Sequence, residues 1–119
     1  MINLSVDEAY AFDYLSILFI KKGMSESAYK TWNDCSIYLN NQIENQLFNE
    51  IINSDEYVRM IEANQKTFNM VDLAKEDKCS ARDVDMCNYE RYKAKINLQN
   101  KFFGNKVSEF KIGYEKYEK

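Results

Sequence analysis

Polar residues interrupt the apolar stripes of two long predicted helices, and they are the best candidates for chemistry in this chain. Arg91 falls inside such a stripe, where an unpaired charge would be very costly, so it needs a carboxylate partner. We expect Asp72 to be that partner, with Glu62 as the alternative. If the two helices form an antiparallel hairpin, six polar side chains face one another between them: Asn64, Gln65, Asp72, Asn88, Arg91 and Lys95.

Two interpretations of this polar cluster are open. The favoured one is a structural network that fixes the register of the hairpin and binds no ligand. The other is a pocket for a small ligand or anion, lined by Arg91, Lys95 and Gln65, in a binding protein or an enzyme. A structure would distinguish the two interpretations, because a functional cluster opens on a pocket whereas a structural network is covered by packed side chains.

The composition excludes several classes of catalytic and metal site. The chain has no histidine, so neither a Ser-His-Asp nor a Cys-His nucleophile can form, and the Glu-x-x-His motif of di-iron bundles is absent. Its three cysteines lack the paired spacing of zinc sites. Its three glycines stand far apart, so there is no phosphate-binding loop. We therefore predict no catalytic residue, no metal and no cofactor, and a non-catalytic interaction or accessory protein.

The elements that carry the polar cluster are predicted to be helices. The chain has no proline, and its apolar residues recur with the helical period over long runs. Serines suited to N-capping mark four helix starts: Ser5, Ser25, Ser54 and Ser80. Glu8 and Asp83 complete capping boxes with the first and last of these serines, and Gly104 ends the last helix. We predict long helices at about residues 6–22, 26–41, 55–77 and 81–103.

A shorter amphipathic segment, Gln42–Ile52, follows the second helix. Asn40 and Asn41 weaken the helix before it, so a separate short helix is expected, and one continuous helix over residues 26–53 is the alternative.

Matching the stripes predicts how the helices pair. Folding the first two about Gly23 places Leu15 opposite Trp32, and folding the last two places Phe68 opposite Arg91. The predicted fold class is therefore all-α: two antiparallel helical hairpins packed as a small four-helix bundle with one extra short helix. Residues 1–104 form this single helical domain, and 105–119 form a charged C-terminal tail.

The first helix is apolar almost all the way round between Ala9 and Ile20. Such a helix is either central in its domain or buried against another copy of the chain. We predict a homo-oligomer that forms through this helix.

The basic C-terminal part of the chain suggests nucleic-acid binding as a further alternative. Residues 88–119 hold eight Lys and Arg against four Asp and Glu, although the whole chain has a net charge of −3. Cations among aromatic side chains suit single strands. The basic residues of the last helix point in different directions, however, and the pI is near 5.0, so this alternative is disfavoured.

The cysteines and the apolar runs predict a compartment. An odd number of cysteines without paired spacing is typical of a reducing environment, in which we expect Cys87 to be buried and Cys79 to be the more exposed thiol. No apolar run approaches the ~20 residues that span a bilayer. We predict a cytoplasmic protein that does not enter the membrane.

Three stretches resemble small uncharacterised proteins of marine tailed bacteriophages, the T4-like cyanophages especially: Val6–Leu18, Ile61–Phe68 and Cys87–Phe103. The resemblance implies an accessory protein acting in an infected bacterial cytoplasm, with a host protein as a possible partner. It implies no activity.

Overall fold

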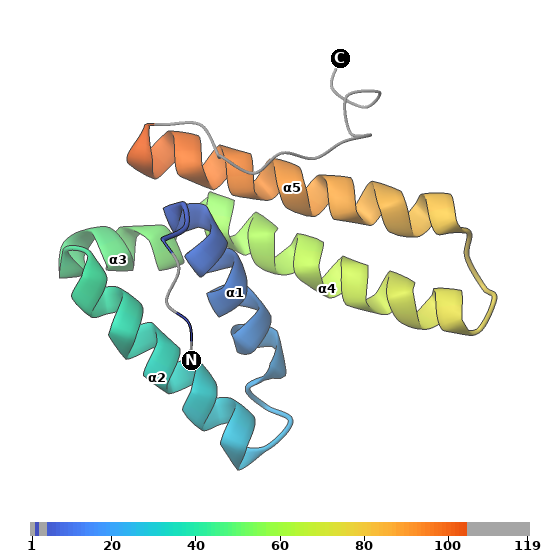
Figure 1. The fold of residues 1–119 in the computed structure, drawn as a ribbon, viewed down its shortest axis with the longest axis horizontal. Coiled ribbons are helices and arrows are strands. Elements are labelled where there is room, and N and C mark those ends of the chain that lie inside the picture. Colours follow the sequence, from blue (N-terminus) through green and yellow to red (C-terminus); the bar gives the residue numbers. More distant parts are fainter. Residues whose placement is uncertain (1, 3–4, 105–119) are drawn as a thin grey trace.

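The computed structural model describes residues 2 and 5–104, and the regular structure of these residues is entirely helical (Figure 1). It consists of five helices: α1 (Glu8–Lys21), α2 (Glu26–Gln42), α3 (Asn45–Ile52), α4 (Asp55–Lys75) and α5 (Ala81–Phe103). The predicted all-α class is confirmed. The tail predicted over 105–119 lies outside the described residues.

Three of the predicted helix starts have the expected caps. The Ser25 hydroxyl accepts a hydrogen bond from the Ala28 amide at 3.0 Å, and Ser54 accepts one from Tyr57 at 3.1 Å. Ser80 forms the predicted capping box before α5. Gly104 has a φ of +68°, the left-handed conformation that ends a helix without steric cost.

The predicted capping box at the start of α1 is wrong. The N-cap residue is Asp7, and its side chain makes no capping hydrogen bond. Instead, the Ala9 amide donates to Oε1 of Gln99 in α5 at 2.8 Å, over a sequence separation of 90 residues. A distant side chain therefore satisfies one of the amides that every helix start leaves unpaired.

Residues 26–53 form two helices rather than one. The break does not fall at Asn40 and Asn41, since α2 continues through both to Gln42. It falls at Ile43, whose backbone is extended (φ −132°, ψ 173°), and the Ile43 side chain packs against the core. The short helix α3 then begins at Asn45.

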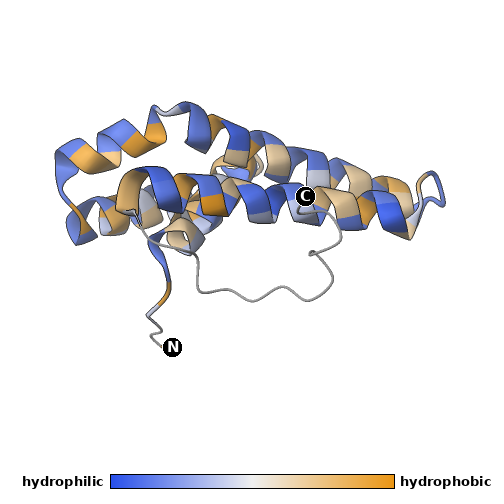
Figure 2. Cartoon of the chain, turned by 90° about the horizontal axis from the view of Figure 1, so that it is seen from above, coloured by the Kyte–Doolittle hydropathy of each residue, from blue (hydrophilic) through white to orange (hydrophobic). Residues whose placement is uncertain are grey.

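Helix α1 is central in the described part of the molecule. It packs against α2, α4 and α5, whereas α2 packs mainly against α1 and α3 (Figure 1). Helix α2 diverges from α4 in this view and contains no buried residue. The all-round apolarity of α1 thus reflects its three neighbours within the chain. Every helix still carries both hydrophilic and hydrophobic residues (Figure 2).

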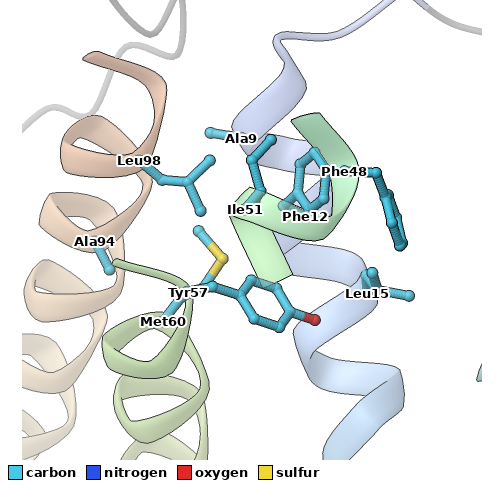
Figure 3. Close-up of a cluster of buried hydrophobic side chains, with 9 residues drawn as sticks. All are labelled: Ala9, Phe12, Leu15, Phe48, Ile51, Tyr57, Met60, Ala94 and Leu98. Atoms are coloured by element: carbon cyan, nitrogen blue, oxygen red, sulfur yellow. The ribbon is translucent and has the colours of Figure 1, made fainter. Parts of the chain in front are cut away.

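The core lies where α1, α3, α4 and α5 meet (Figure 3). The centre of the Phe12 ring lies 6.0 Å from the centre of the Phe48 ring and 6.3 Å from that of the Tyr57 ring. The Phe12 and Tyr57 rings pack edge to face. Burial raises the pKa of the Tyr57 phenol. Nine buried side chains form this core: Ala9, Phe12, Leu15, Phe48, Ile51, Tyr57, Met60, Ala94 and Leu98.

The α4–α5 hairpin forms as predicted, but its register differs by about one helical turn. The Lys66 amine lies 3.2 Å from Glu90, and the Thr67 hydroxyl lies 3.5 Å from the Cys87 carbonyl oxygen. Each α4 residue therefore faces an α5 residue that is earlier in the sequence than predicted. The reason is local: α4 ends at Lys75 instead of residue 77, and Asp77 adopts a left-handed φ of 57°, so the chain reverses sooner.

Candidate functional site

A buried polar network joins three helices beside the core. The Arg91 guanidinium of α5 lies 3.2 Å from a carboxylate oxygen of Asp13 in α1. The other oxygen of that carboxylate accepts a hydrogen bond from the Asn64 amide of α4 at 2.9 Å. Asn64 also donates to the Ser16 hydroxyl at 2.6 Å, and Ser16 donates to the Asp13 carbonyl at 2.7 Å. A helix-spanning network of this kind can fix the relative positions of α1, α4 and α5.

The predicted partner of Arg91 is therefore wrong. Asp72 is exposed, and so is Glu62, the alternative. The carboxylate comes instead from α1, because that helix lies against both members of the hairpin. The prediction considered only the hairpin itself, and the register difference further separates Asp72 from Arg91.

The structure brings together some of the six predicted cluster residues and separates others. Asn64 and Arg91 share the network. Lys95 is also buried, with its amine 4.6 Å from the centre of the Tyr10 ring. Gln65 is exposed and donates to Asn69 at 3.1 Å. Asn88 is half-buried, and Asp72 lies on the surface.

Gln99, which was not predicted, forms a second polar contact between α5 and α1. Besides capping Ala9, its side chain donates to the Glu8 carboxylate at 2.9 Å, and the residue is completely buried. Arg91, Lys95 and Gln99 are spaced four residues apart, so they lie on one face of α5. All three touch α1.

Two sequence signals could have identified this contact. Asp13 is the single charged residue between Ala9 and Ile20, and a lone charge on an apolar helix needs a partner. The four-residue spacing of Arg91, Lys95 and Gln99 marks one polar stripe on an otherwise mixed helix.

The burial of the network favours the structural interpretation. Asn64 is 1% exposed and Ser16 is 0% exposed, so a ligand could reach them only if α1 moved. Their hydrogen-bonding groups are also occupied by one another. One group departs from this pattern: Nε of Arg91 is buried and has no hydrogen-bond partner among the described residues.

The cysteines and acidic residues do not assemble a metal site within residues 2 and 5–104. Cys87 is buried as predicted, and burial raises the pKa of the Cys87 and Cys35 thiols. Cys79 is only half-buried, and its sulfur lies 3.3 Å from the Met70 carbonyl oxygen. None of the helices described is long and apolar enough to cross a membrane.

Several basic side chains of the α4–α5 hairpin already have acidic partners. Lys101 lies 3.0 Å from Glu56, and Lys66 lies 3.2 Å from Glu90. These pairs reduce the positive charge that a nucleic-acid backbone would meet.

The α1–α2 hairpin presents a different surface, which is partly hollow and of mixed polarity. A groove of about 470 Å³ lies between the start of α1 and the end of α2. Its lining has apolar side chains, among them Val6, Tyr38 and Ile43, and polar ones, among them Glu8 and Gln42. Residues 35–43 carry no charged side chain. Charge depletion with exposed aromatic residues is typical of the centre of a protein interface.

A cluster of aromatic residues lies at the turn end of the same hairpin. The centre of the Trp32 ring lies 6.3 Å from the centre of the Phe19 ring and 5.5 Å from that of Tyr29. The Lys22 amine lies 4.3 Å from the ring centres of both Phe19 and Trp32. Trp32 is half-buried and packs against the core.

No protein-family model matches the chain, and no curated protein and no solved structure is significantly similar to it.

Proposed function

We propose that this chain is a non-catalytic interaction protein that associates with copies of itself through the hairpin containing α1. The observation that carries the proposal is the exposed aromatic surface of that hairpin. Tyr14 of α1 is 54% exposed and Tyr38 of α2 is 63% exposed. Large aromatic side chains left in water favour a protein partner, and the residues that flank Tyr38, 35–43, carry no charged side chain.

The state of the polar residues supports the non-catalytic part of this proposal. The side chains best suited to chemistry are packed against one another, and they hold α1 onto the α4–α5 hairpin.

Size-exclusion chromatography with light scattering tests self-association directly. We expect a mass of twice the 14.1 kDa of one chain, decreasing toward the monomer on dilution. A chain that stays monomeric at high micromolar concentration contradicts the proposal.

Anion binding is a second candidate, supported by the unpartnered Nε of Arg91. A thermal-shift titration with inorganic phosphate and with acetate distinguishes it, because an anion that binds the folded state raises the melting temperature by mass action. Arg91→Met should abolish such a shift. If neither anion changes the melting temperature of the parent, this candidate is rejected for these ligands.

The biological setting that we propose comes from the phage resemblance alone. It is an accessory role in the cytoplasm of an infected bacterium, with a host protein as a possible second partner. Affinity capture from bacterial lysate with a Tyr14→Ala control tests whether a partner uses the same surface.

A further inference from the structure

We infer that residues 105–119 dock on their own chain, in the groove between the start of α1 and the end of α2. We call these residues the C-terminal segment. The docked segment covers Tyr38 and therefore limits self-association. That consequence rests on the proposed function, whereas the docking itself does not.

The described chain ends beside the groove. Helix α5 is anchored up to its last turn, because Phe102 and Phe103 pack against the core. Gly104 follows, and its amide donates to the Gln99 carbonyl oxygen at 3.1 Å. The Gln99 side chain donates to the Glu8 carboxylate at 2.9 Å, and Glu8 lines the groove (Figure 1). Gly104 thus stands only five residues after a side chain that contacts the groove lining.

The C-terminal segment is long enough to enter the groove. Its first aromatic residue, Phe110, follows Gly104 by six residues, and six extended residues span up to about 20 Å. The whole segment has 15 residues and spans up to about 50 Å. Several surfaces are therefore within its reach, and their composition must select among them.

The lining of the groove suits apolar side chains. Among the described residues that line it, Glu8 alone is charged. Val6 and Tyr38 are 56% and 63% exposed, so they gain free energy when they are covered. The groove volume of about 470 Å³ is in the range of pockets that hold drug-sized molecules, so aromatic side chains fit. The uncharged polar residues of the lining, Ser5 and Gln42, can hydrogen-bond to the backbone of a docked segment.

The C-terminal segment supplies the apolar side chains. Within eight residues it has three aromatic residues: Phe110, Tyr114 and Tyr117. Phe110, Ile112 and Tyr114 are spaced two residues apart, so they share one face when the segment is extended. Burying such rings is strongly favourable. The segment and the groove therefore offer each other the apolar surface that each lacks.

The groove between α4 and α5 suits the C-terminal segment less well. It also extends toward the end of α5, since Asn97 lines it. Its lining, however, is rich in charged residues: Arg59, Glu62, Lys66, Glu90 and Lys93. Covering these charges with aromatic side chains would remove them from water, which costs free energy. The composition of the two grooves therefore selects the one between α1 and α2.

Methyl NMR spectra of the full chain test the docking. The double variant Phe110→Ser/Tyr114→Ser removes two rings from the C-terminal segment and changes no residue of the five helices. We expect the methyl signals of Val6, Leu39 and Ile43, which line the groove, to move on this substitution, because a nearby aromatic ring shifts the resonances of the methyl groups it covers. Circular dichroism shows whether the helices are intact.

Matched controls identify other positions of the segment. Lys111→Ser/Lys116→Ser changes the segment equally often but removes no ring, so the groove signals should stay in place. Ala63 and Ala94 line the α4–α5 groove, and their methyl signals should not move with the ring variant. Movement there instead, or no movement at any methyl group, refutes the docking. A shift that disappears on dilution shows that the segment reaches another copy, and it refutes docking on the same chain.

Sedimentation equilibrium tests the consequence for self-association. Both copies must release the segment before they associate, so the apparent dissociation constant varies with the inverse square of the undocked fraction. If the segment is docked in about two-thirds of the molecules, Phe110→Ser/Tyr114→Ser should tighten the dimer about tenfold. The control variant Lys111→Ser/Lys116→Ser should change the dissociation constant less than about twofold.

The outcomes separate the inference from the proposed function. A dimer that the ring variant leaves unchanged or weakens refutes the competition with self-association, even where the methyl signals confirm the docking. If the parent and the ring variant are both monomeric, the proposed self-association is refuted, and the methyl signals alone decide the docking.

Discussion

Replacing Arg91 with Met tests the buried network most directly. The substitution keeps the length of the side chain but removes its charge, and the Asp13 carboxylate is left 11% exposed without its cation. Breaking a fully buried ion pair typically costs about 3–5 kcal/mol. The Arg91 side chain is 27% exposed, and Asp13 keeps its hydrogen bond from Asn64, so we expect a smaller loss of about 2 kcal/mol.

The assay is urea unfolding followed by circular dichroism, with a thermal melt in parallel. A loss of about 2 kcal/mol lowers the melting temperature of a domain of this size by about 8 °C. Adding Asp13→Leu should recover at least half of the loss, because two apolar side chains need no partner. Asp72→Leu is the control at an exposed acidic position and should stay within about 0.5 kcal/mol of the parent.

Two results would refute this reasoning. If Arg91→Met unfolds like the parent, the ion pair contributes nothing and Arg91 is free for another role. If the double variant is less stable than Arg91→Met alone, the network is not a replaceable pair, and Asn64 or Ser16 depends on Asp13 more than the geometry indicates.

Three further predictions concern helix ends. Gln99→Leu should lower the free energy of unfolding by about 2 kcal/mol in urea, because it leaves the Ala9 amide buried without an acceptor; an unchanged value would show that water replaces the cap. Gly104→Ala should lower the free energy of unfolding by about 1 kcal/mol, and the loss should come from the φ of +68° alone, because an added Cβ would meet nothing within 4 Å. Gly23→Ala is the control: an added Cβ there is equally free of contacts and the residue has no positive φ, so the free energy of unfolding should not change. Hydrogen bonds from the Ser80 backbone and side chain lower the pKa of Asp83 below its ordinary value of 3.8. The ionised Asp83 therefore stabilises the folded state above pH 3.8, and this stabilisation is lost as the pH falls through the lowered pKa. Asp83→Asn should be less stable than the parent at pH 7, and the stabilities of the two should converge in acid.

Local features of the fold were predictable from the sequence, because short-range interactions determine them. Ser25, Ser54 and Ser80 cap helices whose amides lie three residues away, and Gly104 ends a helix by its own backbone freedom. These signals need no knowledge of the rest of the chain.

The register and the ion pair could not be predicted in the same way. The register depends on where α4 ends, and the left-handed Asp77 has no strong sequence signal, since Asp tolerates that conformation less readily than Gly. The partner of Arg91 depends on which helix covers the hairpin, and a pairwise comparison of two stripes cannot supply a residue from a third helix. Within the cluster, the need of Arg91 for a carboxylate was predictable, but the identity of the carboxylate was not.

The hydrogen bond from Ala9 to Gln99 has a consequence for how the protein is made. During synthesis α1 emerges from the ribosome before α5, but the side chain that completes the start of α1 is 90 residues further on. Arg91, the partner of the one charge in the apolar part of α1, also emerges late. During synthesis, therefore, α1 is an apolar segment with an unpaired end and an unpaired acid until nearly the whole described domain has been translated. A nascent chain stalled before α5 should bind chaperones and be cleaved readily by protease, and it should become resistant only after Gln99 has left the exit tunnel.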